Sequence, residues 1–198
     1  VGGVESEIGR TRTAPAASSA VDRLRFAFVS CQRWDVGLYT GYRDLATQDF
    51  LKSIGVESFF AGCLTLTLQR DPELSRGEFV LAVDLPAQAL THLREMTSRP
   101  VIEMTSLHPK GLGNRERFIV AKYMLYLLQT ASCVVTTRLH AALPSLAFDT
   151  PMFFLPKPQR SYAGRISGLL ELTHHSTLEE FLTRDKYAWD VNDPPANP

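Results

Sequence analysis

The sequence predicts one α/β domain with a Rossmann-like, doubly wound and mostly parallel sheet. Short runs rich in Val, Phe and Ile alternate along the chain with longer amphipathic runs. Such strand–helix alternation is typical of parallel sheets that carry helices on both faces. The short runs also mostly lack polar alternation, as expected for strands that are buried on both faces.

The two ends of the chain differ in composition from its middle. Residues 1–22 are small, polar and aperiodic, which predicts a flexible leader. Asn192 to Pro198 holds three prolines and two asparagines, which predicts a disordered tail. A single domain is therefore expected over residues 23–191, and a chain of 198 residues is of suitable length for it.

Each expected strand is a short run centred on large apolar residues. In chain order the expected strands are Phe26–Ser30, Ser58–Gly62, Phe79–Asp84, Val101–Thr105, Cys133–Thr137 and Met152–Leu155.

The expected helices fill the intervals between these strands and the segment after the last one. In chain order they are Arg43–Ile54, Pro86–Met96, Arg115–Thr130, Leu139–Phe148, Tyr162–Leu172 and Leu178–Thr183. Gly55 suits the end of the first helix, and Pro86 suits the start of the second, where its missing N–H costs nothing. In the longest helix, an apolar stripe predicts the buried face, and its members are Phe118, Ala121, Leu125 and Leu128.

Composition narrows the classes of function. Lys plus Arg and Asp plus Glu both number 21, so no net charge attracts nucleic acid, and no nucleic-acid partner is expected. Three cysteines at wide spacings fit neither a disulfide framework nor a zinc site. A reducing, cytoplasmic location is expected, or the Golgi if the parent protein is eukaryotic with an upstream anchor. No apolar run approaches the roughly 20 residues that span a bilayer, so no transmembrane segment is expected in this chain.

The segment CVVTTRLH carries the first candidate site, because ligands of open α/β sheets bind beyond the carboxyl ends of strands. Arg138 and His140 fall at the expected strand-to-helix junction, where helix N–H groups and a guanidinium attract phosphate or carboxylate. An imidazole at this place can transfer a proton near neutral pH. The structural alternative is that Arg138 pairs with a surface carboxylate and His140 caps its helix.

Two further candidates follow the same logic. Arg43 opens an expected helix in GYRD, where a cation is disfavoured unless an anion is shared with the helix start. His108 follows an expected strand in TSLHPKG, although an ordinary loop histidine is the interpretation that the residues alone favour. The adjacent His174 and His175 lack the carboxylate or cysteine neighbours of a metal site, so we expect them at the surface. No metal site is expected.

Three segments together resemble the polysaccharide pyruvyl transferase family. In order they are GYRDLATQDFLKSIGVESFFAGCLTLTL, RERFIVAKYMLYLLQTASCVVTTRLHAALPSLAFDTPMFF and GRISGLLEL. They span from about residue 40 to residue 170, and the most specific run is Thr137 to Pro151. The resemblance covers the C-terminal half of the family pattern, which implies one half of a glycosyltransferase-B-like fold.

The resemblance also implies a reaction and its residues. Family members transfer a pyruvyl group from phosphoenolpyruvate to two sugar hydroxyls, giving a ketal in exopolysaccharide biosynthesis. Phosphoenolpyruvate is then the donor substrate, a glycan is the acceptor, and no cofactor is expected. The resemblance assigns Arg43, Arg138 and Leu139 to the donor pocket, and His140 to acid–base catalysis. His108 is retained beside them as a candidate substrate-binding residue.

The sequence departs from the family pattern at three places. Asp149 stands where Gly is usual, RWDVGLYT precedes GYRD where the family prefers Pro-Ile-Gly, and the family's N-terminal half has no counterpart here. A missing N-terminal domain leaves open whether this chain is active alone. Two alternatives remain, namely a non-catalytic anion-binding module and a nucleotide-sugar glycosyltransferase of similar fold.

Overall fold

The computed structural model describes residues 41–42, 45–55, 59–60, 63–107, 111–157, 166, 168–183 and 189–198. Its main sheet has five strands in the spatial order β4-β3-β5-β6-β7, and every pair of neighbours is parallel. The strands are β3 (Val80–Val83), β4 (Val101–Met104), β5 (Cys133–Thr136), β6 (Met152–Phe154) and β7 (His174–His175). The predicted fold class is therefore confirmed.

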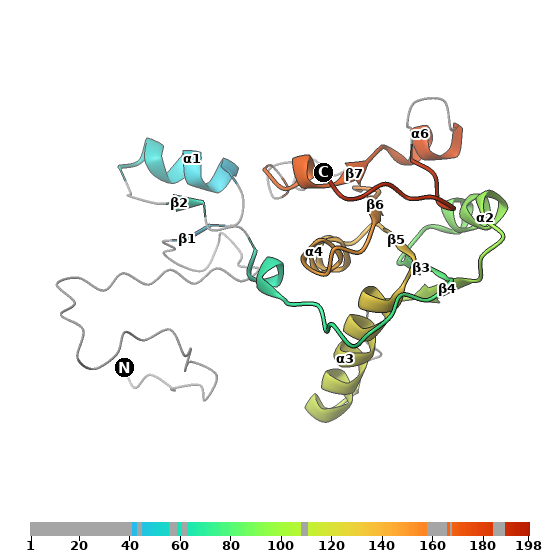
Figure 1. Ribbon diagram of the computed structural model, residues 1–198. Helices are drawn as coiled ribbons and strands as arrows, with labels where there is room; N and C mark the ends of the chain where they lie inside the picture. The colour runs from blue at the N-terminus through green and yellow to red at the C-terminus, as the bar shows by residue number, and fades with distance from the viewer. Residues whose placement is uncertain are drawn as a thin grey trace.

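Helices cover both faces of this sheet, as Figure 1 shows with the sheet seen nearly edge-on. The two faces receive alternate residues of each strand, because successive side chains of a strand point to opposite sides. Leu81 and Val83 pack with α3 (Asn114–Thr130) and α4 (Leu139–Ala147). Val80 and Ala82 pack with α2 (Ala87–Met96) and α6 (Leu178–Thr183). All four residues of β3 and of β5 are buried, which explains their uninterrupted apolar sequence.

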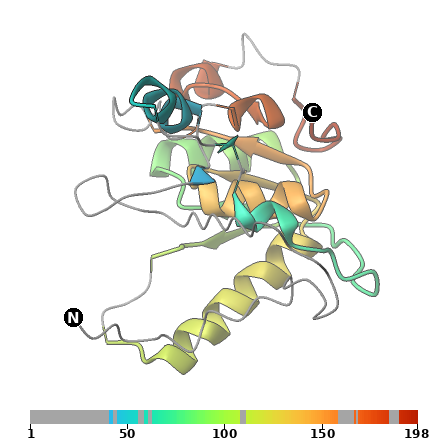
Figure 2. The same cartoon turned by 90° about the vertical axis from the view of Figure 1, so that its left-hand side faces the viewer.

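The predicted buried stripe of α3 is wrong for the first half of that helix. Leu128 is fully buried, but Phe118 is 67 % exposed, and the buried residues of α3 all lie in its last turn. Both ribbon views show why, since the first half of α3 runs out beyond the sheet (Figures 1 and 2). A period of 3.6 residues identifies a shared face, but a neighbouring element is needed to cover it.

The first described elements form a smaller unit. The strands β1 (Gly41–Tyr42) and β2 (Phe59–Phe60) pair in parallel, and α1 (Leu45–Ser53) connects them. Gly55 has a φ of 77°, which matches the glycine end predicted for this helix. The 3-10 helix η1 (Leu64–Thr67) then packs against α4 and leads toward the main sheet. The expected leader and the expected strand Phe26–Ser30 lie outside the described residues.

Two predictions about the C-terminal part need correction. His174 and His175 were expected in a surface connection, but they form β7 and pair with Phe153 and Phe154. His175 is exposed and His174 is half-buried. Of the helix expected over Tyr162–Leu172, the last residues form the 3-10 helix η2 (Leu170–Leu172).

The tail expected to be disordered is hydrogen-bonded to the body of the domain. The Asn192 side-chain amide donates to the Met96 carbonyl at 2.9 Å. The Asn197 amide donates to the Thr150 carbonyl at 2.9 Å, and its side-chain oxygen accepts the Met152 N–H at 3.0 Å. Composition suggested disorder, whereas these two asparagines satisfy backbone groups at the margins of α2 and β6.

Asp149 has the backbone conformation that glycine favours. Its φ is 53°, in the left-handed region that Asp tolerates better than most residues. The Arg76 guanidinium fixes this turn by donating to the Phe148 and Asp149 carbonyls and to the Thr150 hydroxyl. The turn after α4 is therefore left-handed with an aspartate rather than a glycine at this position.

Among the helices that the structure describes, none combines the length and the apolar character needed to cross a bilayer.

Candidate functional site

The candidate site lies where the order of strands reverses. The chain passes from β3 to β4 on one side and then returns to β5 on the other side of β3. The helix after β3 and the helix after β5 lie on opposite faces of the sheet. In open α/β sheets this reversal leaves a crevice beyond the carboxyl ends of the two central strands, and ligands bind there. Here those ends carry Asp84 and Arg138.

Asp84 gathers polar groups from three neighbouring strand ends. Its carboxylate accepts the Thr105 hydroxyl at 2.6 Å, the Ser106 N–H at 3.0 Å and the Ser106 hydroxyl at 2.5 Å, all beyond β4. The Arg138 Nε, beyond β5, donates to the same carboxylate at 2.9 Å. The Asp84 carbonyl also accepts the Thr137 hydroxyl at 2.8 Å. This side chain therefore ties β4, β3 and β5 together at their carboxyl edge.

The electrostatics of Asp84 follow from these contacts. Burial alone would raise the pKa of its carboxyl, but hydrogen bonds from Ser106, Thr105 and Arg138 outweigh burial and lower the pKa from 3.8 to about 2. Asp84 also has a φ of 52°, a left-handed conformation that costs energy outside glycine. This half-buried carboxylate accepts hydrogen bonds from beyond both β4 and β5, so it holds these neighbouring strand ends in fixed geometry.

Arg138 is held by one nitrogen. The Asp84 carboxylate engages Nε, the Arg138 N–H donates to the Thr136 hydroxyl at 2.9 Å, and the side chain remains 31 % exposed. The two terminal guanidinium nitrogens form no hydrogen bond or ion pair with another of the described residues. Those nitrogens form the planar fork that binds phosphate or carboxylate through two parallel hydrogen bonds. The pairing with a carboxylate that was foreseen as the structural alternative is thus present, although Asp84 is only 9 % exposed.

Leu139 and His140 begin α4. Arg138, rather than His140, is the N-cap residue, and it makes no side-chain capping bond. Leu139 is buried in the core, whereas His140 is exposed. The consecutive residues Arg138, Leu139 and His140 therefore present a guanidinium and an imidazole at one strand-to-helix junction.

His140 meets a cysteine that comes from another part of the chain. Cys63 precedes η1, is only 8 % exposed, and lies close enough to His140 for that side chain to influence the pKa of its thiol. The Thr65 hydroxyl donates to the Cys63 sulfur at 3.1 Å. Burial would raise the pKa of the thiol, but hydrogen bonds from His140 and Thr65 reverse the effect and lower it to about 6. The other described cysteine, Cys133, differs, because burial raises the pKa of its thiol to about 12.

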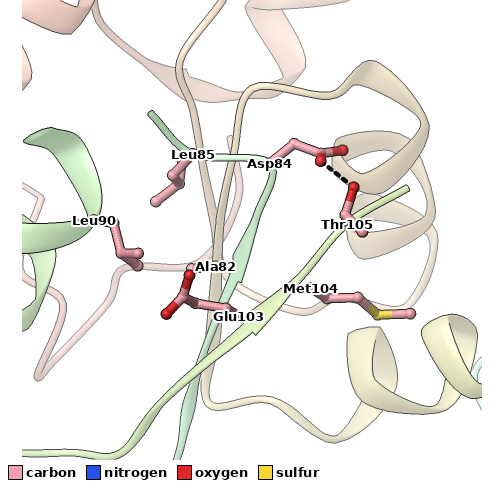
Figure 3. A pocket seen from close by; sticks show the side chains of 7 residues that line it. All are labelled: Ala82, Asp84, Leu85, Leu90, Glu103, Met104 and Thr105. Atoms are coloured by element: carbon pink, nitrogen blue, oxygen red, sulfur yellow. Dashed lines mark hydrogen bonds between the residues drawn. The ribbon is translucent and has the colours of Figure 1, made fainter. Parts of the chain in front are cut away.

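A cavity of about 340 Å³ opens beside Asp84 on the face of the sheet that α2 covers. Figure 3 shows the Asp84 and Thr105 side chains joined across the ends of β3 and β4, with Leu85 and Leu90 on the other side of the cavity. Arg138 and His140 do not line it. The cavity therefore adjoins the strand ends without containing the two residues that the sequence ranked first.

Arg43 and His108, the other candidate substrate-binding residues, lie outside the described residues. Their convergence with Arg138 and His140 stays a prediction. Two residues of the described site were not predicted, namely Asp84 and Cys63. For Asp84 a signal was available, since it directly follows the buried strand β3. Arg138 was predicted from the same kind of position, just after the buried strand β5. For Cys63 the available signal was its place in GCLTLTL, one of the segments that carried the family resemblance.

Comparison with known proteins bears on these residues. The family model described as Polysaccharide pyruvyl transferase matches residues 38–156, which include β3, β5, α4 and the residues between them. A curated relative, alkaline phosphatase D of Bacillus subtilis (strain 168), is 42 % identical over 43 residues. That match covers 22 % of this chain and 7 % of the length of the relative. No solved structure matches.

Proposed function

From the premise that this chain belongs to the polysaccharide pyruvyl transferase family, we propose that its site binds phosphoenolpyruvate and passes the pyruvyl group to a glycan. In this proposal two hydroxyls of the acceptor sugar form a cyclic ketal with the pyruvyl carbon. The observation that carries the proposal is the junction of β5 and α4, where Arg138 and His140 stand together.

The donor has the chemistry that this junction suits. Phosphoenolpyruvate carries a phosphate and a carboxylate, and Arg138 offers a guanidinium fork whose remaining nitrogen is already fixed by Asp84. Fixing Nε restricts the rotation of the side chain, so less conformational entropy is lost when the anion binds. Asp84 is therefore a positioning residue for Arg138 in this proposal.

His140 is the proposed acid–base residue. Its imidazole gives a proton to C3 of the enol, whose π electrons form the new C–H bond and leave C2 electron-poor. The oxygen of the first sugar hydroxyl bonds to C2, and its proton returns to His140. Phosphate then leaves with the electron pair of its bond to C2, stabilised by Arg138. The second hydroxyl closes the ketal at C2, and its proton leaves with the phosphate.

Donor binding can be tested by calorimetric titration of the chain with phosphoenolpyruvate. Arg138→Ala removes a charged hydrogen-bonding group, so we expect a loss of about 1.5–3 kcal/mol, or roughly a ten- to hundred-fold higher Kd. Arg99→Ala is the matched control, because Arg99 is also partly exposed (25 %) and paired with a glutamate, Glu78. It lies before β4, at the opposite edge of the sheet, and its replacement should leave donor affinity unchanged.

Three outcomes distinguish the candidate functions. Phosphate release from phosphoenolpyruvate in the presence of methyl glycosides, lost in His140→Ala, supports pyruvyl transfer. Donor binding without release under any acceptor supports a non-catalytic anion-binding module. Binding of nucleotide sugars in place of phosphoenolpyruvate, or an unchanged Kd in Arg138→Ala, contradicts the proposal.

A further inference from the structure

The cavity beside Asp84 has no role in the donor contacts described above. Its volume of about 340 Å³ lies at the low end of the roughly 300–1,000 Å³ that small-molecule sites have, so it suits a single ring-sized ligand. Arg138 and His140 do not line it. A molecule in this cavity is therefore a second ligand, which binds next to the donor and not in its place.

Two carboxylates supply most of the polar lining of the cavity. Glu103 projects from β4 on the side where α2 lies (Figure 3), and Arg94 is its one hydrogen-bond partner among the described residues. The Asp84 Oδ1 accepts one hydrogen bond, from the Thr105 hydroxyl at 2.6 Å. Because a carboxylate oxygen can accept two hydrogen bonds, both carboxylates keep acceptors free, whereas the Thr105 hydroxyl has already used its proton. The lining side chains therefore favour a ligand that brings hydrogen-bond donors.

The charges at the cavity are balanced although two carboxylates line it. Arg94 pairs with Glu103, and Arg138 pairs with Asp84 at 2.9 Å. A phosphate or carboxylate ligand would meet acceptors and no free side-chain donor, so its own oxygens would lose hydrogen bonds that water provides. An ammonium ligand would gain little, since an arginine already neutralises each carboxylate. A neutral ligand with several hydroxyls meets both conditions.

The rest of the lining is apolar and held in place. Leu85 and Leu90 line the cavity, and both pack against the core cluster on the α2 side of the sheet. Ala82 of β3 also lines it and is only 2 % exposed. A sugar ring carries C–H groups on its faces and hydroxyls at its rim, so it can cover the leucines and donate to the carboxylates at once.

We propose that this cavity binds one neutral sugar unit of the glycan acceptor, the unit next to the sugar that receives the pyruvyl group. Glu103 and Asp84 accept hydrogen bonds from its hydroxyls, and Leu85 and Leu90 cover a face of its ring. The inference rests on the proposed function, because pyruvyl transfer is what requires a glycan. Asp84 both lines the cavity and holds Arg138 through Oδ2, so a sugar bound here lies beside the donor.

Sugar binding can be measured without turnover, by NMR titration of the labelled chain with methyl hexopyranosides. We expect the methyl signals of Leu85 and Leu90 to shift. Glu103→Ala should raise the Kd of the sugar about tenfold or more, since a hydrogen bond to a charged group is lost. The side chains of Arg94 and Glu103 are 51 % and 53 % exposed, so separating them costs the fold little. Leu90→Trp should weaken binding at least as much, because the larger ring occupies part of the cavity.

Each variant has a matched control. Leu172→Trp adds the same bulk in a separate cavity of about 270 Å³, which Leu66 and Leu146 also line. Glu78→Ala removes another carboxylate that pairs with an arginine, Arg99, but does not line the cavity beside Asp84. Both controls should leave the Kd of the sugar unchanged. The Kd of phosphoenolpyruvate, measured by calorimetry, should be the same in all four variants, since Arg138 and Asp84 are retained.

Three results of the titration overturn the inference. They are the absence of shifts with every methyl hexopyranoside, an unchanged Kd in either Glu103→Ala or Leu90→Trp, and displacement of the sugar by inorganic phosphate. Tenfold tighter binding of glucosamine than of methyl glucoside would show a cation site and would also overturn it. Failure of the proposed function gives a different result, because phosphoenolpyruvate then fails to bind or to release phosphate while the sugar shifts remain.

A kinetic comparison tests which sugar unit the cavity holds. In phosphate release from phosphoenolpyruvate, Glu103→Ala should raise KM for methyl disaccharide acceptors about tenfold and leave kcat and the KM of phosphoenolpyruvate nearly unchanged. With methyl monosaccharide acceptors the same variant should match the parent, because the reacting sugar lies outside the cavity. An equal rise in KM for both kinds of acceptor would place the reacting sugar itself in the cavity and overturn the assignment to the neighbouring unit.

Discussion

Replacing Asp84 with Asn removes one negative charge at the crossing of three strand ends and leaves the shape of the side chain almost unchanged. Asn also tolerates the left-handed φ of 52° at this position. The amide oxygen can still accept from Ser106 and Arg138, while the amide nitrogen can donate to the Thr105 hydroxyl. The variant therefore tests the charge more than the hydrogen-bond geometry.

The size of the effect follows from the pKa of the Asp84 carboxyl, which falls from 3.8 to about 2 on folding. That difference is worth roughly 2 kcal/mol of stability. Because the folded-state pKa is the lower one, the contribution is complete above pH 4 and is lost as the pH falls toward 2. We expect the gap in unfolding free energy between the parent and Asp84→Asn to be about 2 kcal/mol at pH 7 and roughly half of that near pH 3.

Urea denaturation at several pH values measures this gap. Asp149→Asn is the matched control, because Asp149 also has a left-handed φ, of 53°, but its side chain is exposed. The control should differ little from the parent at any pH. A gap for Asp84→Asn that stays constant from pH 7 to pH 3 would refute the assignment of this stability to the ionised carboxylate.

Two further predictions test the turn after α4 and the exposed half of α3. Asp149→Gly should be at least about 1 kcal/mol more stable than Asp149→Ala in thermal denaturation, because a left-handed backbone is strained for Ala and not for Gly. Equal stability of the two variants would contradict the φ of 53°. Leu128→Ala should cost about 2–5 kcal/mol in urea denaturation, since its side chain is fully buried, and Phe118→Ser should cost under about 0.5 kcal/mol, since its ring is largely exposed. A large loss for Phe118→Ser would mean that the first half of α3 is covered after all.

The sequence was most informative where burial is complete. The runs at β3 and β5 are buried on both faces, and this leaves an apolar signal that predicted them within two residues. β7 has only two residues, both His, so neither an apolar run nor an alternating pattern marks it. Its pairing with β6 is supplied by the tertiary structure alone.

The candidate site was predictable only in part for a similar reason. Arg138 and His140 lie next to a clear strand-to-helix boundary, so their place on the sheet edge follows from local pattern. The partners of these residues come from elsewhere in the chain. Asp84 is 54 residues from Arg138, and no periodicity in one sequence connects them. Cys63 likewise reaches His140 only because η1 packs against α4.

The place of β4 at the margin of the five-stranded sheet has a consequence for self-association. Among the described strands, β4 pairs only with β3, so its outer row of backbone N–H and C=O groups can accept a further extended segment from another molecule. Ile102, at 37 % exposure, would make such an addition favourable. Pro100 just before the strand and the charged pair of Glu103 with Arg94 oppose it, because a proline cannot extend the ladder and buried charges are costly. Pro100 and Glu103, two residues within four positions of the chain, thus disfavour edge-to-edge association of these molecules.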